Sequence, residues 1–265
     1  MWRCLLNNLR VSKILNFPNH VYKLDKALYG LKQAPRAWYE RLFKIYVDDI
    51  IFGATNNGLC KYFTELMGGE FEMSIMGELN FFLGLQIKQI AEGIMIHQQK
   101  YFKELLKKYN RENTKTNHTP MGTATRLDED PQGKSVDQTT YRGMIGSLLY
   151  LTASRPDIAF SIGLCARFQS NPKESHLTVV KRILIYLKGT DDMCLFYPRS
   201  DDFMLRRFTD ADYAGDLVNR KSTSSMVQFL GYCLVSWGTK KQNTVALSTA
   251  EAEYVAAAAC FSQVL

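Results

Sequence analysis

Two adjacent carboxylates interrupt an otherwise apolar, β-prone run, and they constrain the fold more than any other feature of the chain. The run covers residues 43–53, and Asp48 and Asp49 follow Tyr46 and Val47 within it. Burying neighbouring like charges is costly, because burial opposes ionisation and the two charges repel. A tight strand–turn–strand hairpin would project both acids at its tip, where their oxygens could hold Mg²⁺. The alternative is an ordinary Asp-Asp turn.

The patterning of the other residues predicts an α+β protein, and the length of 265 residues favours two units. Residues 81–90 form a strand-like run that reverses at Gly93, and apolar side chains recur at helical spacing over residues 101–109. A turn-rich surface connection is expected over 117–134. The elements expected beyond it are helices within 139–189, strands over 205–213, 226–233 and 234–237, a turn at Gly231 and an Ala-rich helix opened by Ser248.

Positive charge is concentrated in two places and points to a polyanionic partner. The chain carries 33 Lys and Arg against 26 acidic residues, and residues 1–41 hold eight of the basic residues with only Asp25 and Glu40. The second cluster lies on the predicted helix and consists of Lys100, Lys103, Lys107, Lys108 and Arg111. Nucleic acid is the first partner to consider for such clusters. Solvated helix faces are an equally simple explanation.

Composition limits the cellular compartments in which the chain is expected. The six cysteines form no C-x-x-C pair, which disfavours structural zinc and indicates reduced thiols in an intracellular protein, either cytoplasmic or nuclear. The longest apolar run, residues 255–261, is too short to span a membrane, so no membrane partner is expected. Residues 1–15 make a poor signal peptide, and organelle targeting is not favoured.

Blocks of sequence in a fixed order point to a known family. They are residues 21–39, 46–49, 81–87, 141–157, 209–216 and 251–254. Together they resemble the reverse transcriptase and RNase H region of the Pol polyprotein of copia-type long-terminal-repeat retrotransposons, and the resemblance extends over residues 19–265. It implies RNA-directed DNA polymerase and ribonuclease H activities, both two-metal phosphoryl transfers that use Mg²⁺ or Mn²⁺. The implied partners are an RNA template, a DNA primer, an RNA–DNA hybrid and other parts of the Pol polyprotein.

The resemblance assigns roles in the polymerase half. Asp48 would be a metal-binding catalytic carboxylate of the palm, with Asp49 its weaker neighbour. Phe82, Leu83 and Gly84 would form the hairpin that grips the primer terminus, although core packing is the alternative for Phe82 and Leu83. The remaining nucleic-acid contacts implied are Gln33 and Arg36, beside the nucleotide and template, and the thumb-like lysines Lys100, Lys103, Lys107 and Lys108.

In the RNase H-like half, residue spacing separates the candidate acids. Asp210 and Asp212 share one strand face because they are two residues apart, and the resemblance favours Asp210 as a metal ligand. Ser248 and Glu251 have the spacing of a capping box, which gives Glu251 a structural role. Glu253 lies about 200° further around the helix and is therefore the better catalytic and metal-binding candidate.

The predicted organisation has four parts: an unmatched segment 1–18, a partial reverse-transcriptase palm and thumb over 19–115, a linker and helical connection over 116–200, and an incomplete RNase H-like domain over 201–265. Residues 1–18 contain no acid, although the family supplies a metal-binding Asp from a strand before residues 22–39. Only residues 40–45 separate Tyr39 from Tyr46, where family members have about thirty, and the family's further RNase H acids follow the Glu253 helix. We therefore expect a truncated, internally deleted and inactive copy. The alternatives are an active enzyme, a noncatalytic nucleic-acid-binding remnant and an unselected relic.

Overall fold

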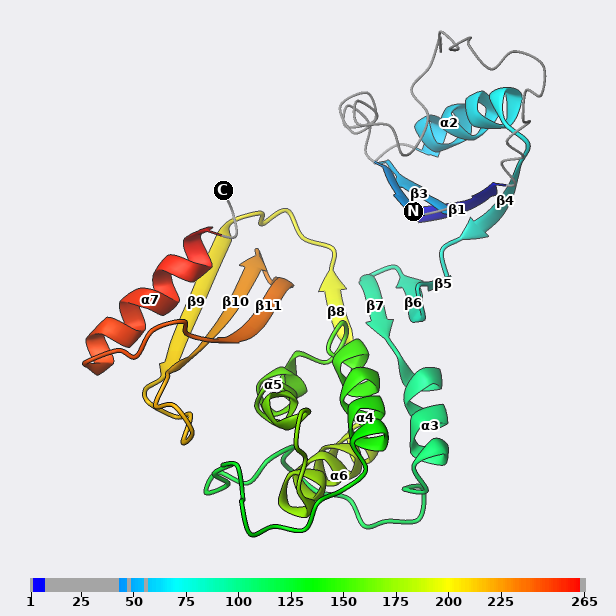
Figure 1. The fold of residues 1–265 in the computed structure, drawn as a ribbon. Helices are drawn as coiled ribbons and strands as arrows, with labels where there is room; N and C mark the ends of the chain where they lie inside the picture. The colour runs from blue at the N-terminus through cyan, green and yellow to red at the C-terminus, as the bar shows by residue number, and fades with distance from the viewer. Residues whose placement is uncertain (1, 8–42, 47–48, 55–56, 263–265) are drawn as a thin grey trace, which may run out of the picture. The chain divides into compact units, whose positions relative to one another are not determined.

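The computed structural model describes residues 2–7, 43–46, 49–54 and 57–262, and it has the mixed helix and sheet content predicted (Figure 1). The chain divides into two compact units, residues 1–80 and 81–265. The unit boundary therefore falls inside the segment 19–115 that the sequence grouped together. None of the helices in the described part of the chain has the length and apolar character needed to cross a membrane.

The first unit is an antiparallel sheet with one helix. Strands β2 (Phe43–Tyr46) and β3 (Asp49–Gly53) form the expected hairpin, in which Tyr46 pairs with Asp49. Strand β1 (Trp2–Asn7) lies between β3 and β4 (Met73–Glu78), giving the order β2-β3-β1-β4. Helix α2 (Asn57–Glu70) contributes Cys60 and Met67 to a small hydrophobic cluster with Ile50 and Phe52.

The second unit begins with a sheet whose last edge strand comes from a distant part of the sequence. Strands β5 (Phe81–Phe82), β6 (Leu85–Ile90) and β7 (Gly93–His97) form successive antiparallel hairpins. The reversal at Gly93 is confirmed, but a turn at Leu83 and Gly84 divides the run 81–90 into two strands. Strand β8 (Leu195–Pro198) then pairs with β7. Helix α3 (Gln99–Lys108) follows β7 directly and buries its apolar residues Phe102, Leu105 and Leu106.

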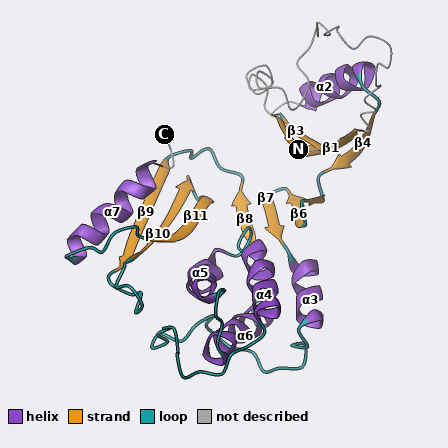
Figure 2. Cartoon of the chain, in the orientation of Figure 1, coloured by secondary structure: helices purple, strands orange, loops and turns teal. Residues whose placement is uncertain are grey.

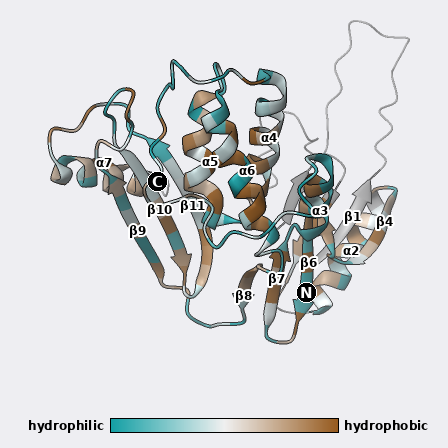
Figure 3. Ribbon diagram, turned by 90° about the horizontal axis from the view of Figure 1, so that it is seen from below, coloured by the Kyte–Doolittle hydropathy of each residue, from teal (hydrophilic) through white to brown (hydrophobic). Residues whose placement is uncertain are grey.

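A helical layer holds the largest core of the described chain. It consists of α4 (Gln138–Leu151), α5 (Ala159–Cys165) and α6 (Glu174–Lys188), with short 3₁₀ turns η1 (Pro156–Ile158) and η2 (Ala166–Phe168) on either side of α5 (Figure 2). Hydrophobic residues, brown in Figure 3, recur along these helices, and Tyr141, Ile145, Leu148, Ile183 and Leu184 are fully buried. The helices expected within 139–189 are confirmed.

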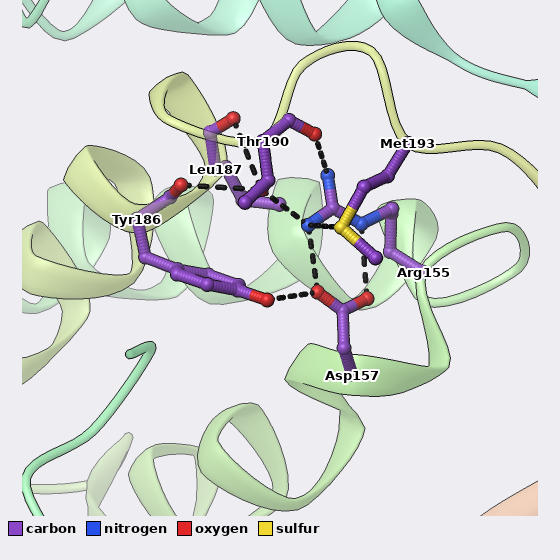
Figure 4. Close-up of polar contacts among 6 residues, drawn as sticks. All are labelled: Arg155, Asp157, Tyr186, Leu187, Thr190 and Met193. Carbon is purple, nitrogen blue, oxygen red and sulfur yellow. Dashed lines mark hydrogen bonds and ion pairs between the residues drawn. The ribbon is translucent and has the colours of Figure 1, made fainter. Parts of the chain in front are cut away.

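A largely buried ion pair between Arg155 and Asp157 lies against the end of α6. The Arg155 guanidinium donates to both carboxylate oxygens of Asp157, at 2.9 and 2.6 Å, and the Tyr186 hydroxyl donates to Asp157 at 2.7 Å (Figure 4). Arg155 also donates to the carbonyl and hydroxyl oxygens of Thr190, at 2.9 and 2.6 Å. Burial opposes the charge on Asp157, but the bonds from Arg155 and Tyr186 hold the pKa of this carboxyl below its usual range. The Ser154–Asp157 block of the sequence therefore has a structural role in joining η1 to α6.

The last part of the chain forms a three-stranded antiparallel sheet with a helix. Its strands are β9 (Leu205–Asp212), β10 (Thr223–Leu230) and β11 (Cys233–Lys241), in the order β11-β10-β9, and Gly231 has the positive φ of the predicted turn. Strand β10 begins at Thr223 rather than Met226, because the polar residues before Met226 still pair with β9. Helix α7 (Thr249–Ser262) runs alongside β9 (Figure 1).

Candidate functional site

The acidic hairpin of the first unit is described only in its backbone. Asp49 begins β3, whereas Asp48, Gln33 and Arg36 lie outside the described residues. Strand β1 pairs with β3 so that Leu6 is opposite Asp49. The sequence of β1, Trp-Arg-Cys-Leu-Leu-Asn, contains no acid. The strand beside the hairpin therefore contributes no carboxylate of its own.

The candidate primer-contacting hairpin lies in the second unit, at the turn between β5 and β6. Phe82 is buried, as core packing predicted, whereas Leu83 and Phe81 have 41% and 56% of their surface exposed. Leu83 and Gly84 form a two-residue turn with φ values of 49° and 75°. Positive φ at both central residues is the geometry of a type I′ turn, which matches the twist of the two strands. The exposed side chains at this tip are therefore Leu83 and Phe81, and the buried Phe82 side chain holds strand β5 against the protein.

Helix α3 presents the basic face that its sequence predicted. Lys100, Lys103, Lys107 and Lys108 are exposed, while the opposite face of the helix is buried. Lys107 and Lys108 occupy the last turn, where positive charge interacts favourably with the helix dipole. Four ammonium groups on ten residues form a compact source of positive potential.

The acids of β9 lie on the sheet face away from α7. The Arg207 guanidinium stacks over the Phe261 ring of α7, at 5.2 Å from the ring centroid, so the Arg207 face is covered by this helix. Strand alternation places Asp210 and Asp212 together on the opposite face, as their spacing predicted. Asp210 is exposed, and Asp212 lines a cleft of about 410 Å³ with Gly215 and Asp216.

The two glutamates of α7 have different contacts. Glu251 accepts a hydrogen bond from the Leu247 N–H at 2.7 Å, and the Ser248 hydroxyl accepts one from the Glu251 N–H at 3.2 Å. The Ser248 bond is the one that a capping box predicts, whereas the Glu251 side chain bonds the N–H one residue before Ser248. Glu253 instead reaches β9, where its carboxylate accepts a hydrogen bond from the Ala211 N–H at 3.2 Å. The structure therefore brings Glu253 to the strand that carries Asp210, and its catalytic role stays a prediction.

These acids do not assemble a complete metal centre among the described residues. Within that part of the chain, no group of three or more His, Cys, Asp or Glu side chains is placed to hold a metal ion. Mg²⁺ is usually held by one or two carboxylates together with several waters, and one oxygen of the Glu253 carboxylate accepts a backbone bond. The described residues thus bring Glu253 to the strand that carries Asp210, without a third acid placed to share a metal ion.

Asp216 was expected from the sequence to be a turn residue, and the structure gives it a second role in a buried charge cluster. It is buried, and its carboxylate accepts from Arg167 at 3.0 Å and from Lys241 at 3.1 Å. Arg167 also donates to the Thr223 hydroxyl at 2.7 Å. Burial opposes the Asp216 charge, but the bond from Lys241 and the Asn219 N–H, with the charge of Arg167, hold the pKa of this carboxyl below its usual range. This cluster fastens η2 to the β9–β11 sheet.

Comparisons with known proteins identify a matching family and several relatives. The family model described as "Reverse transcriptase (RNA-dependent DNA polymerase)" matches residues 40–123. The Pol polyprotein of transposon RE1 from Arabidopsis thaliana is 36% identical over 89% of this chain, and that of transposon TNT 1-94 from Nicotiana tabacum is 34% identical over 89%. An uncharacterized mitochondrial protein of Arabidopsis thaliana is 32% identical, over 81% of this chain and 89% of that protein. No solved structure matches the chain.

The family match assigns residues 40–123 to the reverse-transcriptase family, within a chain of mixed helix and sheet. More particularly, the chain belongs to the copia-type retrotransposon Pol family. It covers 18% of the RE1 polyprotein and 21% of the TNT 1-94 polyprotein, about a fifth of these relatives.

Proposed function

We propose that the chain binds nucleic acid as the polymerase and RNase H-like part of a retrotransposon Pol protein, without carrying out phosphoryl transfer by itself. Its ligands are a primer–template and an RNA–DNA hybrid. The RNase H-like assignment of residues 201–265 rests on the sequence resemblance and is supported by Glu253 reaching the strand of Asp210.

The exposed basic face of α3 carries this proposal. Its four lysines project from a helix whose other face is anchored by Phe102, Leu105 and Leu106, so the charges are held on a fixed support. A fixed row of ammonium groups suits phosphates, because each contact releases condensed counterions. This binding needs none of the candidate metal-ligand acids and persists without a working metal site.

Two observations support the absence of phosphoryl transfer. Strand β1 occupies the place beside the acidic hairpin and contains no carboxylate that could share a metal ion with Asp48. In the other half, Glu253 is engaged with a backbone N–H, and Asp216 is neutralised by Arg167 and Lys241. Two-metal phosphoryl transfer requires carboxylates that bridge both ions.

The test measures binding and catalysis on the same monodisperse sample. We expect fluorescence anisotropy to show salt-dependent binding of a labelled primer–template and of an RNA–DNA hybrid. We also expect neither nucleotide addition nor RNA cleavage with Mg²⁺ or Mn²⁺. Extension that is lost in Asp48→Ala, or hybrid cleavage that is lost in Asp210→Asn, would contradict the catalytic half of the proposal. A monodisperse chain without affinity for either ligand would contradict the binding half.

A further inference from the structure

The turn at Leu83 and Gly84 needs support from outside its own hairpin. Leu83 has a φ of 49°, a left-handed conformation that side chains other than glycine adopt at a cost. Strand β5 comprises two residues and pairs with β6 through only Phe81 and Phe82. So short a pairing gives the turn little stability of its own. A contact from another element must therefore hold the exposed tip.

Tyr150 of α4 supplies that contact from 67 positions further along the chain. Its hydroxyl donates a hydrogen bond to the Leu83 carbonyl oxygen. The same hydroxyl lies where a Cβ atom at residue 84 would fall, so Gly84 is required both for its φ of 75° and for the space that Tyr150 occupies. The hydroxyl thus touches the backbone of both turn residues.

Tyr150 is itself held in a fixed orientation. The Tyr101 ring of α3 packs edge-on against it, with ring centroids 4.9 Å apart and an interplanar angle of 76°. On its other face, α4 buries Tyr141, Ile145 and Leu148 in the main core. A second tie secures the base of the hairpin, where the Gln86 side-chain oxygen accepts a bond from the Lys100 N–H at 2.7 Å. The hairpin is therefore fastened to α4 at its tip and to α3 at its base.

We infer that Tyr150 is a positioning residue for nucleic-acid binding: its hydroxyl fixes the β5–β6 turn so that Leu83 and Phe81 meet the end of a primer. The inference rests on the proposed function. It assigns control of the primer-contacting turn to α4, an element of the helical connection, rather than to the acidic hairpin of the first unit. The exposed fractions of Leu83 and Phe81 leave both side chains available to a ligand.

The experiment compares the full chain with Tyr150→Phe, which removes only the hydroxyl. Tyr101→Phe is the matched control, because it removes a neighbouring hydroxyl that bonds the Ser147 carbonyl oxygen, away from the turn. Hydrogen–deuterium exchange of residues 83–86 reports the turn without any nucleic acid. Affinities for a recessed primer–template and for a blunt duplex of the same length report recognition of the primer end.

We expect Tyr150→Phe to raise exchange at the turn and to lower the preference for the recessed end by about three- to tenfold, the factor that one ordinary hydrogen bond contributes. Affinity for the blunt duplex and the unfolding temperature should match those of Tyr101→Phe. Unchanged exchange in Tyr150→Phe would overturn the positioning role. A wild-type chain that binds both duplexes equally would overturn the inference while leaving the proposed nucleic-acid binding intact, and one that binds neither would overturn both.

Discussion

At the scale of single residues, Asp216 is the acid whose environment the structure defines most fully. It joins Arg167 of η2 to Lys241 of β11, and its second oxygen accepts from the Val218 and Asn219 N–H groups at 3.0 and 3.2 Å. Both oxygens are thus satisfied in a buried position. Removing one partner of a buried ion pair is strongly destabilising, because the remaining charge is left without compensation.

We predict that Asp216→Asn lowers the free energy of unfolding by about 3 kcal/mol at pH 7, the loss typical of a broken buried pair. The folded-state pKa of Asp216 is below the 3.8 of the unfolded chain, so its stabilisation is present above pH 3.8 and fades as the pH falls through the folded-state value. The difference between wild type and Asp216→Asn should therefore shrink in strong acid. Urea unfolding of both proteins over a range of pH measures this difference in the free energy of unfolding.

Asp202→Asn is the matched control for this measurement. Asp202 also pairs with an arginine, Arg206, at 3.0 Å, but both side chains are substantially exposed. Exposed pairs contribute little, so this variant should unfold almost as the wild type does. Equal unfolding energies for the two variants would contradict the structural role assigned to Asp216.

Sequence reasoning succeeded for residues whose neighbours are close along the chain. The capping box of Ser248 and Glu251 spans three positions, and the helix angle between Glu251 and Glu253 followed from the same short segment. The bond from Arg167 to Asp216 joins positions 49 apart, and that from Tyr150 to Leu83 joins positions 67 apart. Local periodicity contains no information about such distant pairs. Both hydrogen bonds could therefore be identified only from the three-dimensional structure.

At the scale of elements, α3 combines an anchored apolar face with an exposed face on which four lysines surround Glu104. We predict that neutralising Lys100, Lys103, Lys107 and Lys108 together flattens the slope of log affinity against log salt by about three units. Each phosphate contact contributes about 0.7 to 0.9 to this slope, and four contacts are removed. Different nucleic-acid sequences should be weakened about equally, because phosphate contacts do not read bases. Titrations at several salt concentrations measure the slope.

The control changes four lysines that are scattered over the described chain. Lys61, Lys115, Lys134 and Lys240 are exposed and belong to four different segments, so their replacement alters the net charge equally without touching α3. A slope that falls as much in this variant as in the α3 variant would show that the effect comes from net charge and would exclude α3 as the contact.

Elements with a clear local pattern were predicted, whereas β1, α2, β4 and β8 were not. The hairpins and the helices α3, α6 and α7 each show a period, a start signal or a turn residue in the sequence. Trp2–Asn7 shows no alternation of apolar and polar residues, and its strand character comes from pairing with β3 and β4 on both sides. A central strand of this kind is specified by its neighbours rather than by its own residues.

At the scale of the whole molecule, the two compact units have unequal cores. The main cluster of the second unit contains seventeen buried residues from α3 to α6, whereas the described cluster of the first contains Ile50, Phe52, Cys60 and Met67. Small cores supply little of the free energy needed to offset chain entropy. Among the described residues, the second unit thus has far more buried core to support independent folding.

We predict that residues 81–265, produced alone, unfold in one cooperative thermal transition, and that residues 1–80 alone do not. Circular dichroism and the dispersion of amide signals in NMR spectra measure both fragments. A cooperative transition in residues 1–80, or the absence of one in residues 81–265, would contradict this prediction about which unit is stable by itself.

The pairing of β7 with β8 also sets an order of events during synthesis. The two strands lie about a hundred positions apart, so β7 leaves the ribosome long before its partner exists. At a typical 5 to 20 residues per second, that interval lasts about 5 to 20 s. Throughout it, the apolar segment Gly-Ile-Met-Ile has one unpaired edge, which is a template for association with other chains. Association at this edge before Leu195–Pro198 arrives would lower the yield of folded protein.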